Sequence, residues 1–313
     1  MSTISLRAMW TTAMALAALS VGCADLPMGN PDGGRRDAGR DTGTGQDGAP
    51  TPVPPPAPPG LMCDVAATYV YAVDGDNQLL QFDPAARRFT LIGRLSCPTQ
   101  APGATPFSMG VSRDATAWIL YSSGELFRVN TANAACSATS YRAGQMGFRL
   151  FGMGYSSSTA GGTDEQLHIA GDSRGPSGGG TPLLGTLNVS TMSVAQTSTT
   201  ALPGWPELTG TGNAELWGFF PQGTPSVRQI DKRSGATTRS IPVTGLDARS
   251  TRAWAFAFWG GRFYVFVLAG SQTSTDVWQV DPRDNSATRI LQNTGYTIVG
   301  AGVSTCAPIM IPG

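Results

Sequence analysis

The sequence predicts an all-β domain, a five-bladed β-propeller, over residues 61–308. Three observations predict this fold class. Four types of short strand follow one another in a fixed order, and that order recurs five times. The first-type strands start 44, 57, 46 and 45 residues apart. Helical periodicity is absent, and four strands per unit at a spacing of about 45 residues are typical of propeller blades.

The first strand type is rich in small residues, as expected for the innermost strand of a blade, which crowds the central axis. Inner strands are expected at 108–111, 152–155, 209–212, 255–258 and 300–303. The second type is apolar and aromatic, because a strand held between neighbouring blades is buried on both faces. Second strands are expected at 69–73, 117–121, 167–171, 216–220 and 263–267.

The third strand type ends in Asn or Asp, which favours a turn into the next strand. Third strands are expected at 79–83, 126–130, 184–188, 227–231 and 277–281. The fourth type is polar, as suits a half-exposed outer edge. Fourth strands are expected at 88–92, 138–142, 193–198, 237–241 and 287–291.

The order of strand types also predicts how the ring closes. The first unit begins with a second-type strand, 69–73, so its inner strand must be the C-terminal one, 300–303. No covalent turn joins these two strands, and a Cys63–Cys306 disulfide would replace it. Cys97–Cys136 then follows by elimination, since an exported chain meets an oxidising compartment. A zinc site is the rival, but the sequence has no C-x-x-C spacing.

Two other folds stay open. A six-bladed ring would hide one degenerate blade in the 57-residue interval, although the glycine-rich insert at 172–181 accounts for the excess as a loop. A β-sandwich is the third choice.

The N-terminal 60 residues predict export and tethering. Residues 1–22 combine Arg7, an apolar run too short to span a bilayer and small residues before a cysteine. The segment before Cys23 resembles the lipobox of bacterial lipoproteins, which implies a lipid on Cys23 and membrane attachment; ordinary secretion is the alternative. Ala24 implies the outer membrane by that family's sorting rule. Residues 23–60, rich in Gly and Pro, predict a disordered tether.

Composition excludes several functions. The 21 basic and 21 acidic residues balance, which argues against a nucleic-acid partner. The single histidine, His168, excludes multi-histidine metal sites, and it is expected to be a buried structural group with its hydrogen bonds satisfied, rather than a base. We expect no metal, no cofactor and a monomer.

The segment YVYAVDGDNQLLQFDPAARRFTLIG (69–93) resembles the repeats of secreted bacterial propellers, including YVTN-type and quinoprotein-like repeats. The whole chain is similar to bacterial lipoproteins that carry a propeller domain. The resemblance implies the fold and an exposed location. It implies no activity, because the quoted pattern is architectural.

The residues that enter the inner strands predict a site at the channel mouth. Three consecutive blades offer Arg149, Glu207 and Arg252 there, beside Trp205 and Trp254. One hypothesis is a small anionic or sugar-acid ligand held by the two arginines, with Glu207 orienting it. The alternative is a salt-bridged plug that closes the channel.

An enzyme would need more. Glycoside hydrolysis requires two carboxylates about 5–10 Å apart. Glu207 is the only acid at an inner-strand entry, and its partner would come from loop acids: Asp74, Asp76, Glu125, Asp172 or Asp276. DGDN (74–77) favours a hairpin turn over a calcium loop, since it lacks the distal Glu and the helix.

The sequence therefore predicts a membrane-tethered, extracytoplasmic propeller that acts as a binding or interaction platform for a protein, peptide or glycan. A carbohydrate-active hydrolase using Glu207 is one alternative. A structural cell-envelope lipoprotein is the other.

Overall fold

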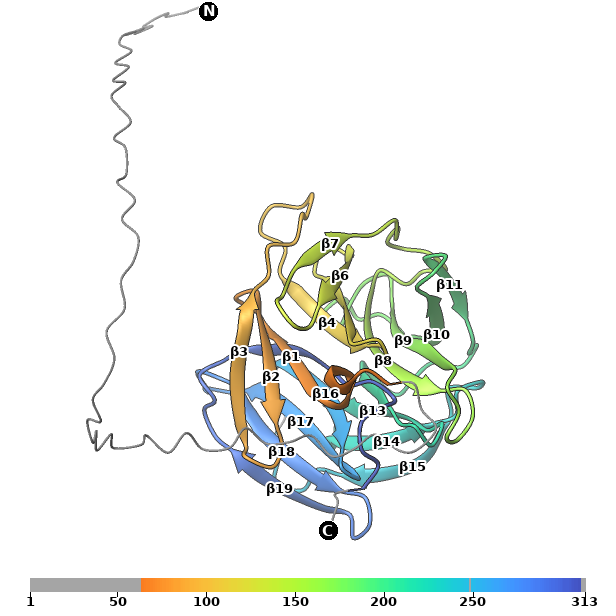
Figure 1. The fold of residues 1–313 in the computed structure, drawn as a ribbon. Coiled ribbons are helices and arrows are strands. Elements are labelled where there is room, and N and C mark those ends of the chain that lie inside the picture. Colours follow the sequence, from red (N-terminus) through yellow and green to blue (C-terminus); the bar gives the residue numbers. More distant parts are fainter. Residues whose placement is uncertain (1–62, 248, 311–313) are drawn as a thin grey trace, which may run out of the picture. The chain divides into compact units, whose positions relative to one another are not determined.

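Five antiparallel four-stranded sheets stand around a common axis in the computed structural model (Figure 1). The structure describes residues 63–247 and 249–310. The predicted signal peptide (1–22) and tether (23–60), with Cys23, lie outside the described residues. In the described part of the chain, no helix is long and apolar enough to cross a membrane.

Each sheet is one blade, and its strands follow one another from the axis outward. Blade 1 contains β20 (Ile298–Gly302), β1 (Val70–Asp74), β2 (Gln78–Asp83) and β3 (Arg88–Arg94). Blade 2 contains β4 (Pro106–Val111), β5 (Thr116–Tyr121), β6 (Leu126–Asn130) and β7 (Cys136–Ala138). Blade 3 contains β8 (Leu150–Ser157), β9 (Glu165–Asp172), β10 (Leu183–Asn188) and β11 (Ser193–Gln196). Blade 4 contains β12 (Glu207–Gly210), β13 (Leu216–Phe220), β14 (Ser226–Ile230) and β15 (Thr237–Pro242). Blade 5 contains β16 (Thr251–Trp259), β17 (Arg262–Ala269), β18 (Asp276–Asp281) and β19 (Ser286–Leu291).

The ring closes in blade 1, as predicted. Strand β20 pairs antiparallel with β1, with Tyr71 opposite Gly302 and Val73 opposite Gly300. The Cys63–Cys306 disulfide joins the segments that flank these two strands, with Cα atoms 6.0 Å apart. The second predicted disulfide, Cys97–Cys136, is also formed. A short 3-10 helix, η1 (Val65–Thr68), links Cys63 to β1.

Small residues on the inner strands are required by backbone contact between blades. A Cβ atom on Gly152 of β8 would lie 2.2 Å from the carbonyl oxygen of Pro206, which precedes β12. One on Gly210 would lie 2.2 Å from the carbonyl oxygen of Tyr155. Side chains at these two positions would force blades 3 and 4 apart.

The core lies between the blades, where the second and third strands bring aromatic side chains together. Phe82 of blade 1 meets Phe266 of blade 5 edge to face, with ring centroids 5.4 Å apart. Trp217 of blade 4 and Phe263 of blade 5 are 4.7 Å apart. The prediction that these strands are sandwiched is therefore confirmed.

The Asn or Asp at the end of the third strand caps the following turn in all five blades. In each case its Oδ1 accepts a backbone N–H two residues further on, at 2.8–3.2 Å. The five residues are Asp83, Asn130, Asn188, Asp231 and Asp281. The turn interpretation is thus confirmed.

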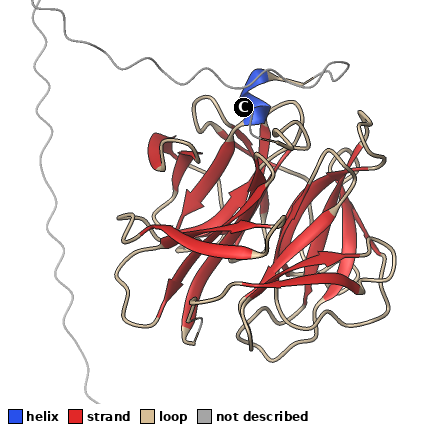
Figure 2. Cartoon of the chain, turned by 90° about the horizontal axis from the view of Figure 1, so that it is seen from below, coloured by secondary structure: helices blue, strands red, loops and turns tan. Residues whose placement is uncertain are grey.

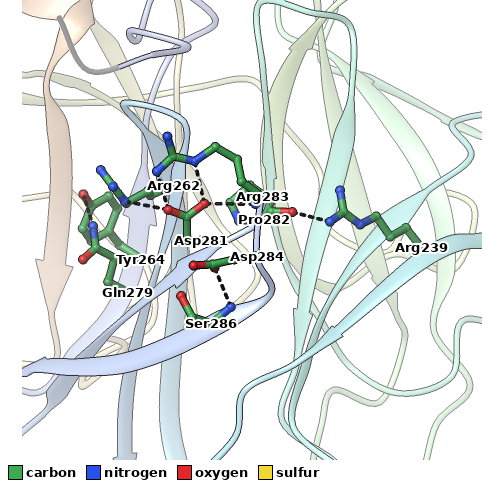
Figure 3. Close-up of polar contacts among 9 residues, drawn as sticks. All are labelled: Arg239, Arg262, Tyr264, Gln279, Asp281, Pro282, Arg283, Asp284 and Ser286. Carbon is green, nitrogen blue, oxygen red and sulfur yellow. Dashed lines mark hydrogen bonds and ion pairs between the residues drawn. The ribbon is translucent and has the colours of Figure 1, made fainter. Parts of the chain in front are cut away.

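At the rim between blades 4 and 5, Asp281 is the centre of a cluster of arginines (Figure 3). Arg283 donates to its carboxylate at 2.5 Å and Arg262 at 3.3 Å. The bonds from Arg283 lower the pKa of the Asp281 carboxyl. Arg239 of blade 4 donates to Asn285 Oδ1 at 2.9 Å and to the Pro282 carbonyl. The bonds from Arg239 to Pro282 and Asn285 therefore join blade 4 to blade 5 at the rim.

Two expected strand positions need correction. The outer strand of blade 2 is Cys136–Ala138, not 138–142, because the chain leaves the sheet and buries Tyr141 in the core beside Phe151. The inner strand of blade 4 begins at Glu207 rather than 209, since Thr211 already belongs to the turn that Glu215 closes.

The alternative folds are also excluded. The described residues are almost entirely strands and loops (Figure 2). Five sheets surround the axis, and the long interval between the inner strands of blades 3 and 4 contains the loop between β9 and β10. Asp172 Oδ1 caps that loop by accepting from Arg174 N and Gly175 N.

Candidate ligand site at the channel mouth

A pocket of about 320 Å³ lies where the inner strands begin. Phe107 of blade 2, Glu207 of blade 4, Arg252 of blade 5 and Val299 of blade 1 line it, each at or near the start of its inner strand. Blade 3 contributes its β9–β10 loop, through Pro176 and Ser177. All five blades therefore meet at this mouth.

The opposite end of the inner strands is crossed by the segment that follows β20. Ser304, Thr305 and Cys306 are buried there. The hydroxyl of Ser304 donates to the Ala67 carbonyl at 2.7 Å, and Gly260 N–H donates to the Pro308 carbonyl at 2.7 Å. The segment thus fastens blade 1 to blade 5 across this face.

A buried polar network holds the same segment to blades 2 and 3. Thr305 Oγ1 donates to Glu165 Oε2 at 2.9 Å and accepts from Arg113 Nη1 at 3.0 Å. Arg113 N–H donates to Glu165 Oε1 at 2.7 Å. Burial raises the pKa of Glu165, and these hydrogen bonds oppose the shift.

Glu207 is the first residue of β12 and is 4% exposed. The Ser108 hydroxyl, across the mouth in blade 2, donates to its Oε2 at 2.8 Å. Ser108 Oγ in turn accepts from Met153 N–H at 3.1 Å. Burial raises the pKa of Glu207 well above its ordinary value, and the hydrogen bonds only partly oppose this. The site therefore favours the neutral acid.

The predicted salt-bridged plug is not formed. The ion pairs within the described residues join Arg249–Asp247, Arg262–Asp281, Arg283–Asp281 and Arg289–Asp276, and none includes Glu207. Ser108 takes the position that an arginine was expected to fill. Because Ser108 comes from the inner strand of blade 2, the contact spans 99 residues of sequence.

The five predicted ligand residues divide into two groups. Glu207, Arg252 and Trp254 lie together in the pocket, and the exposed Arg252 also donates from Nη2 to the Gln272 carbonyl. Arg149 and Trp205 do not line it. Arg149 is exposed beside blade 3, with its backbone N–H on the Asp172 carbonyl at 3.1 Å.

Trp205 contacts the pocket only indirectly, through the lining residue Gln222. It is buried, and its backbone N–H donates at 3.1 Å to Oε1 of Gln222, a lining residue. Sequence reasoning missed Gln222 and Ser108. Ser108 opens the predicted inner strand SMGV, so its polarity in an otherwise apolar stretch was the available indication. Nothing in the sequence marked Gln222.

No second carboxylate joins Glu207 among the described residues that line the pocket. The candidate partners accept hydrogen bonds from loop backbone instead. Asp74 Oδ1 accepts from Asp76 N at 3.0 Å and Gln78 N at 2.8 Å, which makes DGDN the expected hairpin turn. Glu125 accepts from Gln100 N at 2.8 Å, and Asp276 accepts from Asn293 N at 2.8 Å. The carboxylate pair that a hydrolase would need is not built at this mouth.

His168 of β9 is buried, as predicted, with 4% exposure. The expectation that it is a satisfied structural group is wrong: within the described ranges, neither ring nitrogen has a hydrogen-bond partner. Burial, and then the charge of Lys232, lower its pKa to about 3. The imidazole is therefore neutral at physiological pH.

No protein-family model matches the sequence, and no curated protein matches it. Among solved structures, a chain of the nidogen/laminin complex is similar at 10% identity and a TM-score of 0.44, covering 75% of this chain and 97% of that one. TolB from Acinetobacter baumannii is similar at 11% identity and a TM-score of 0.41, covering 72% of this chain and 52% of that one. At these values the comparisons carry no inference about function. The fold assignment therefore depends on the five sheets themselves, and these define a five-bladed β-propeller.

Proposed function

We propose that this chain is an extracytoplasmic binding protein, monomeric and tethered to a membrane through a lipid on Cys23, whose propeller takes a ligand at the channel mouth. One observation carries the proposal: all five blades converge on a pocket of about 320 Å³ with a buried carboxyl group at its edge. That volume lies at the small end of ligand sites. A glycan unit or a short peptide segment matches this size.

The two disulfides support the location, because such bonds persist in oxidising, extracytoplasmic compartments. The lipobox-like segment before Cys23 and the Ala at position 24 support lipid anchoring and the outer membrane. Labelling with a radioactive fatty acid tests the anchor. The full chain should incorporate label, and Cys23→Ala should not; equal labelling of both chains would refute the anchor.

The binding site is tested with matched charge reversals on two faces. Arg252→Glu alters the pocket, whereas Arg233→Glu alters the β14–β15 turn, at the opposite ends of the strands. Defined oligosaccharides and peptides are titrated against each full-length variant while intrinsic tryptophan fluorescence is followed, since Trp254 lines the pocket.

We expect at least one probe to bind the wild type and Arg233→Glu equally and to bind Arg252→Glu at least tenfold more weakly. Binding that survives Arg252→Glu would refute this pocket as the site. Absence of binding by every probe would instead favour the structural-lipoprotein alternative.

A further inference from the structure

Two of the polar side chains that line the pocket, Arg252 and Gln222, present N–H donors, and the lining also includes Ser177 and Thr251. Arg252 has five N–H donors, and one Nη2 bond to the Gln272 carbonyl holds the guanidinium in place. Gln222 already accepts Trp205 N–H with its Oε1, so its remaining polar group is the amide NH₂. Glu207 is the only carboxyl group among the lining residues that the structure describes.

The hydrogen bonds around Glu207 place its proton. Ser108 Oγ accepts from Met153 N–H and donates to Glu207 Oε2, so Oε2 already receives a hydrogen. In the neutral acid, an O–H on Oε1 keeps both of these hydrogen bonds as they stand. Glu207 then offers one more donor, whereas an ionised Glu207 would offer a negative charge and no donor.

Apolar side chains form most of the remaining lining, which also includes Ser177 and Thr251. Phe107 and Trp254 provide aromatic faces, and Pro106 and Pro176 stand at the entrance from blades 2 and 3. Rings of this kind pack against the C–H faces of a compact, ring-shaped ligand, while the donors take its polar end.

We infer that the pocket binds the carboxylate of a sugar acid, with the guanidinium of Arg252 as its cationic partner, the Glu207 carboxyl group as a hydrogen-bonding partner and the aromatic walls around the sugar ring. This inference rests on the proposed function and specifies its ligand. It assigns the exposed cation and the buried acid complementary roles that neither could perform alone.

The pairing makes binding dependent on pH. An anion binds beside Glu207 only while that carboxyl is neutral, so affinity falls about tenfold per pH unit above the pKa of Glu207. Arg252 is the only other charged group among the described lining residues. The groups packed on Glu207 from β4 and β8 are Ser108, Met153 N–H and the Gly152 backbone, all uncharged.

The test is calorimetric titration of the full chain with three probes at pH 5 and pH 8. Glucuronate carries both the ring and the carboxylate, glucose carries the ring alone, and acetate carries the carboxylate alone. We expect glucuronate to bind at least tenfold more tightly than either of the others at pH 5, and no more tightly at pH 8, because ionising Glu207 disfavours a bound anion. If acetate binds as tightly as glucuronate, the pocket recognises a carboxylate but not the sugar ring, and the inference of a sugar-acid ligand is refuted.

Two variants complete the design. Arg252→Gln should weaken glucuronate binding at least tenfold, with Arg233→Gln on the opposite face as its matched control. Glu207→Gln keeps a neutral donor, so it should bind glucuronate with little change at pH 5 and lose the pH dependence.

The outcomes separate the two proposals. If glucose binds as tightly as glucuronate and both depend on Arg252, the carboxylate inference fails and the pocket remains a binding site. If glucuronate binds regardless of Arg252, or does not bind at all, the inference is refuted. A thermal unfolding scan of Glu207→Gln establishes that the variant is folded; if it is not, the Arg252→Gln result alone decides.

Discussion

Lowering the pH should destabilise the propeller through His168. Its imidazole is buried beside Lys232, and its pKa falls from 6.5 to about 3. Between these values the unfolded chain binds a proton that the folded chain does not. A group whose folded pKa is depressed in this way stabilises the fold above its unfolded pKa, and that stability is lost as the pH falls.

The magnitude follows from the separation of the two pKa values. Each pH unit below 6.5 costs about 1.4 kcal/mol until the folded pKa is reached. Between pH 7 and pH 4.5 the contribution of His168 therefore amounts to about 2.5 kcal/mol of unfolding free energy. No discount for solvent screening applies, because the side chain is almost completely buried.

The assay is urea unfolding at pH 7 and pH 4.5, with both disulfides intact, on the wild type and His168→Leu. Leucine has no titrating group and leaves no buried nitrogen without a partner. His168→Leu should be more stable than the wild type by about 1 kcal/mol at pH 7, since burying unpaired polar atoms is costly. At pH 4.5 the difference should widen by about 2.5 kcal/mol.

Comparing two chains isolates this effect from other titrations. Burial raises the pKa of Glu207, Glu165 and Asp74. Those groups stabilise the fold at low pH and lose that contribution as the pH rises, which is the opposite sign. They are present in both chains, so they cancel in the difference. If the stability difference between wild type and His168→Leu is the same at both pH values, the imidazole does not titrate as described and the reasoning is refuted.

Two further perturbations test the architecture. Replacing both cysteines of the Cys63–Cys306 bridge with serine should lower the free energy of unfolding by about 5 kcal/mol, and the same change at Cys97–Cys136 should lower it by about 4 kcal/mol. The entropy that a disulfide removes from the unfolded chain grows with the separation of its cysteines, which is 243 residues for the first and 39 for the second. Denaturant unfolding measures both losses, and a greater loss for Cys97–Cys136 would contradict the reasoning. Gly152→Ala should lower the free energy of unfolding by about 3 kcal/mol or more, since the added Cβ would collide with backbone atoms of blade 4. Gly75→Ala is the control: its Cβ meets other atoms only at 3.9 Å, so stability should change by no more than about 0.5 kcal/mol. Equal melting temperatures for the two variants would show that the inner strands are not packed backbone to backbone.

The blade count, the closing strand and both disulfides could be predicted from sequence, because each depends on repetition and order. Small residues recur wherever an inner strand must approach its neighbour, as at Gly152. Asn or Asp recurs wherever the third strand turns, as at Asp231. Because no turn joins β20 to β1, the two cysteines that flank these strands are expected to pair, and the other two described cysteines then pair with each other.

The site could be predicted only in part, because its contacts cross between blades. Glu207 reaches Ser108 over blade 3, where Gly152 has no side chain to stand in the way. That contact depends on which inner strand stands two places round the ring, which no local pattern encodes. Arg149 enters blade 3 in the same way that Arg252 enters blade 5, yet only Arg252 lines the pocket. The β9–β10 loop supplies blade 3's lining residues instead, and its course is set by tertiary contacts.

The position of β20 has a consequence for folding during synthesis. Strand β1 leads the domain in sequence, but its inner partner is made more than 220 residues later, so its edge stays unpaired until residue 302 has been synthesised. An open, apolar strand edge invites pairing with other chains and attack by proteases. Cys63 likewise waits for Cys306 before it can be oxidised to its native partner. Synthesis from the N-terminus therefore leaves the ring unfinished until its final stage, and a chaperone that shields β1 during that interval would protect the strand edge that stays open longest.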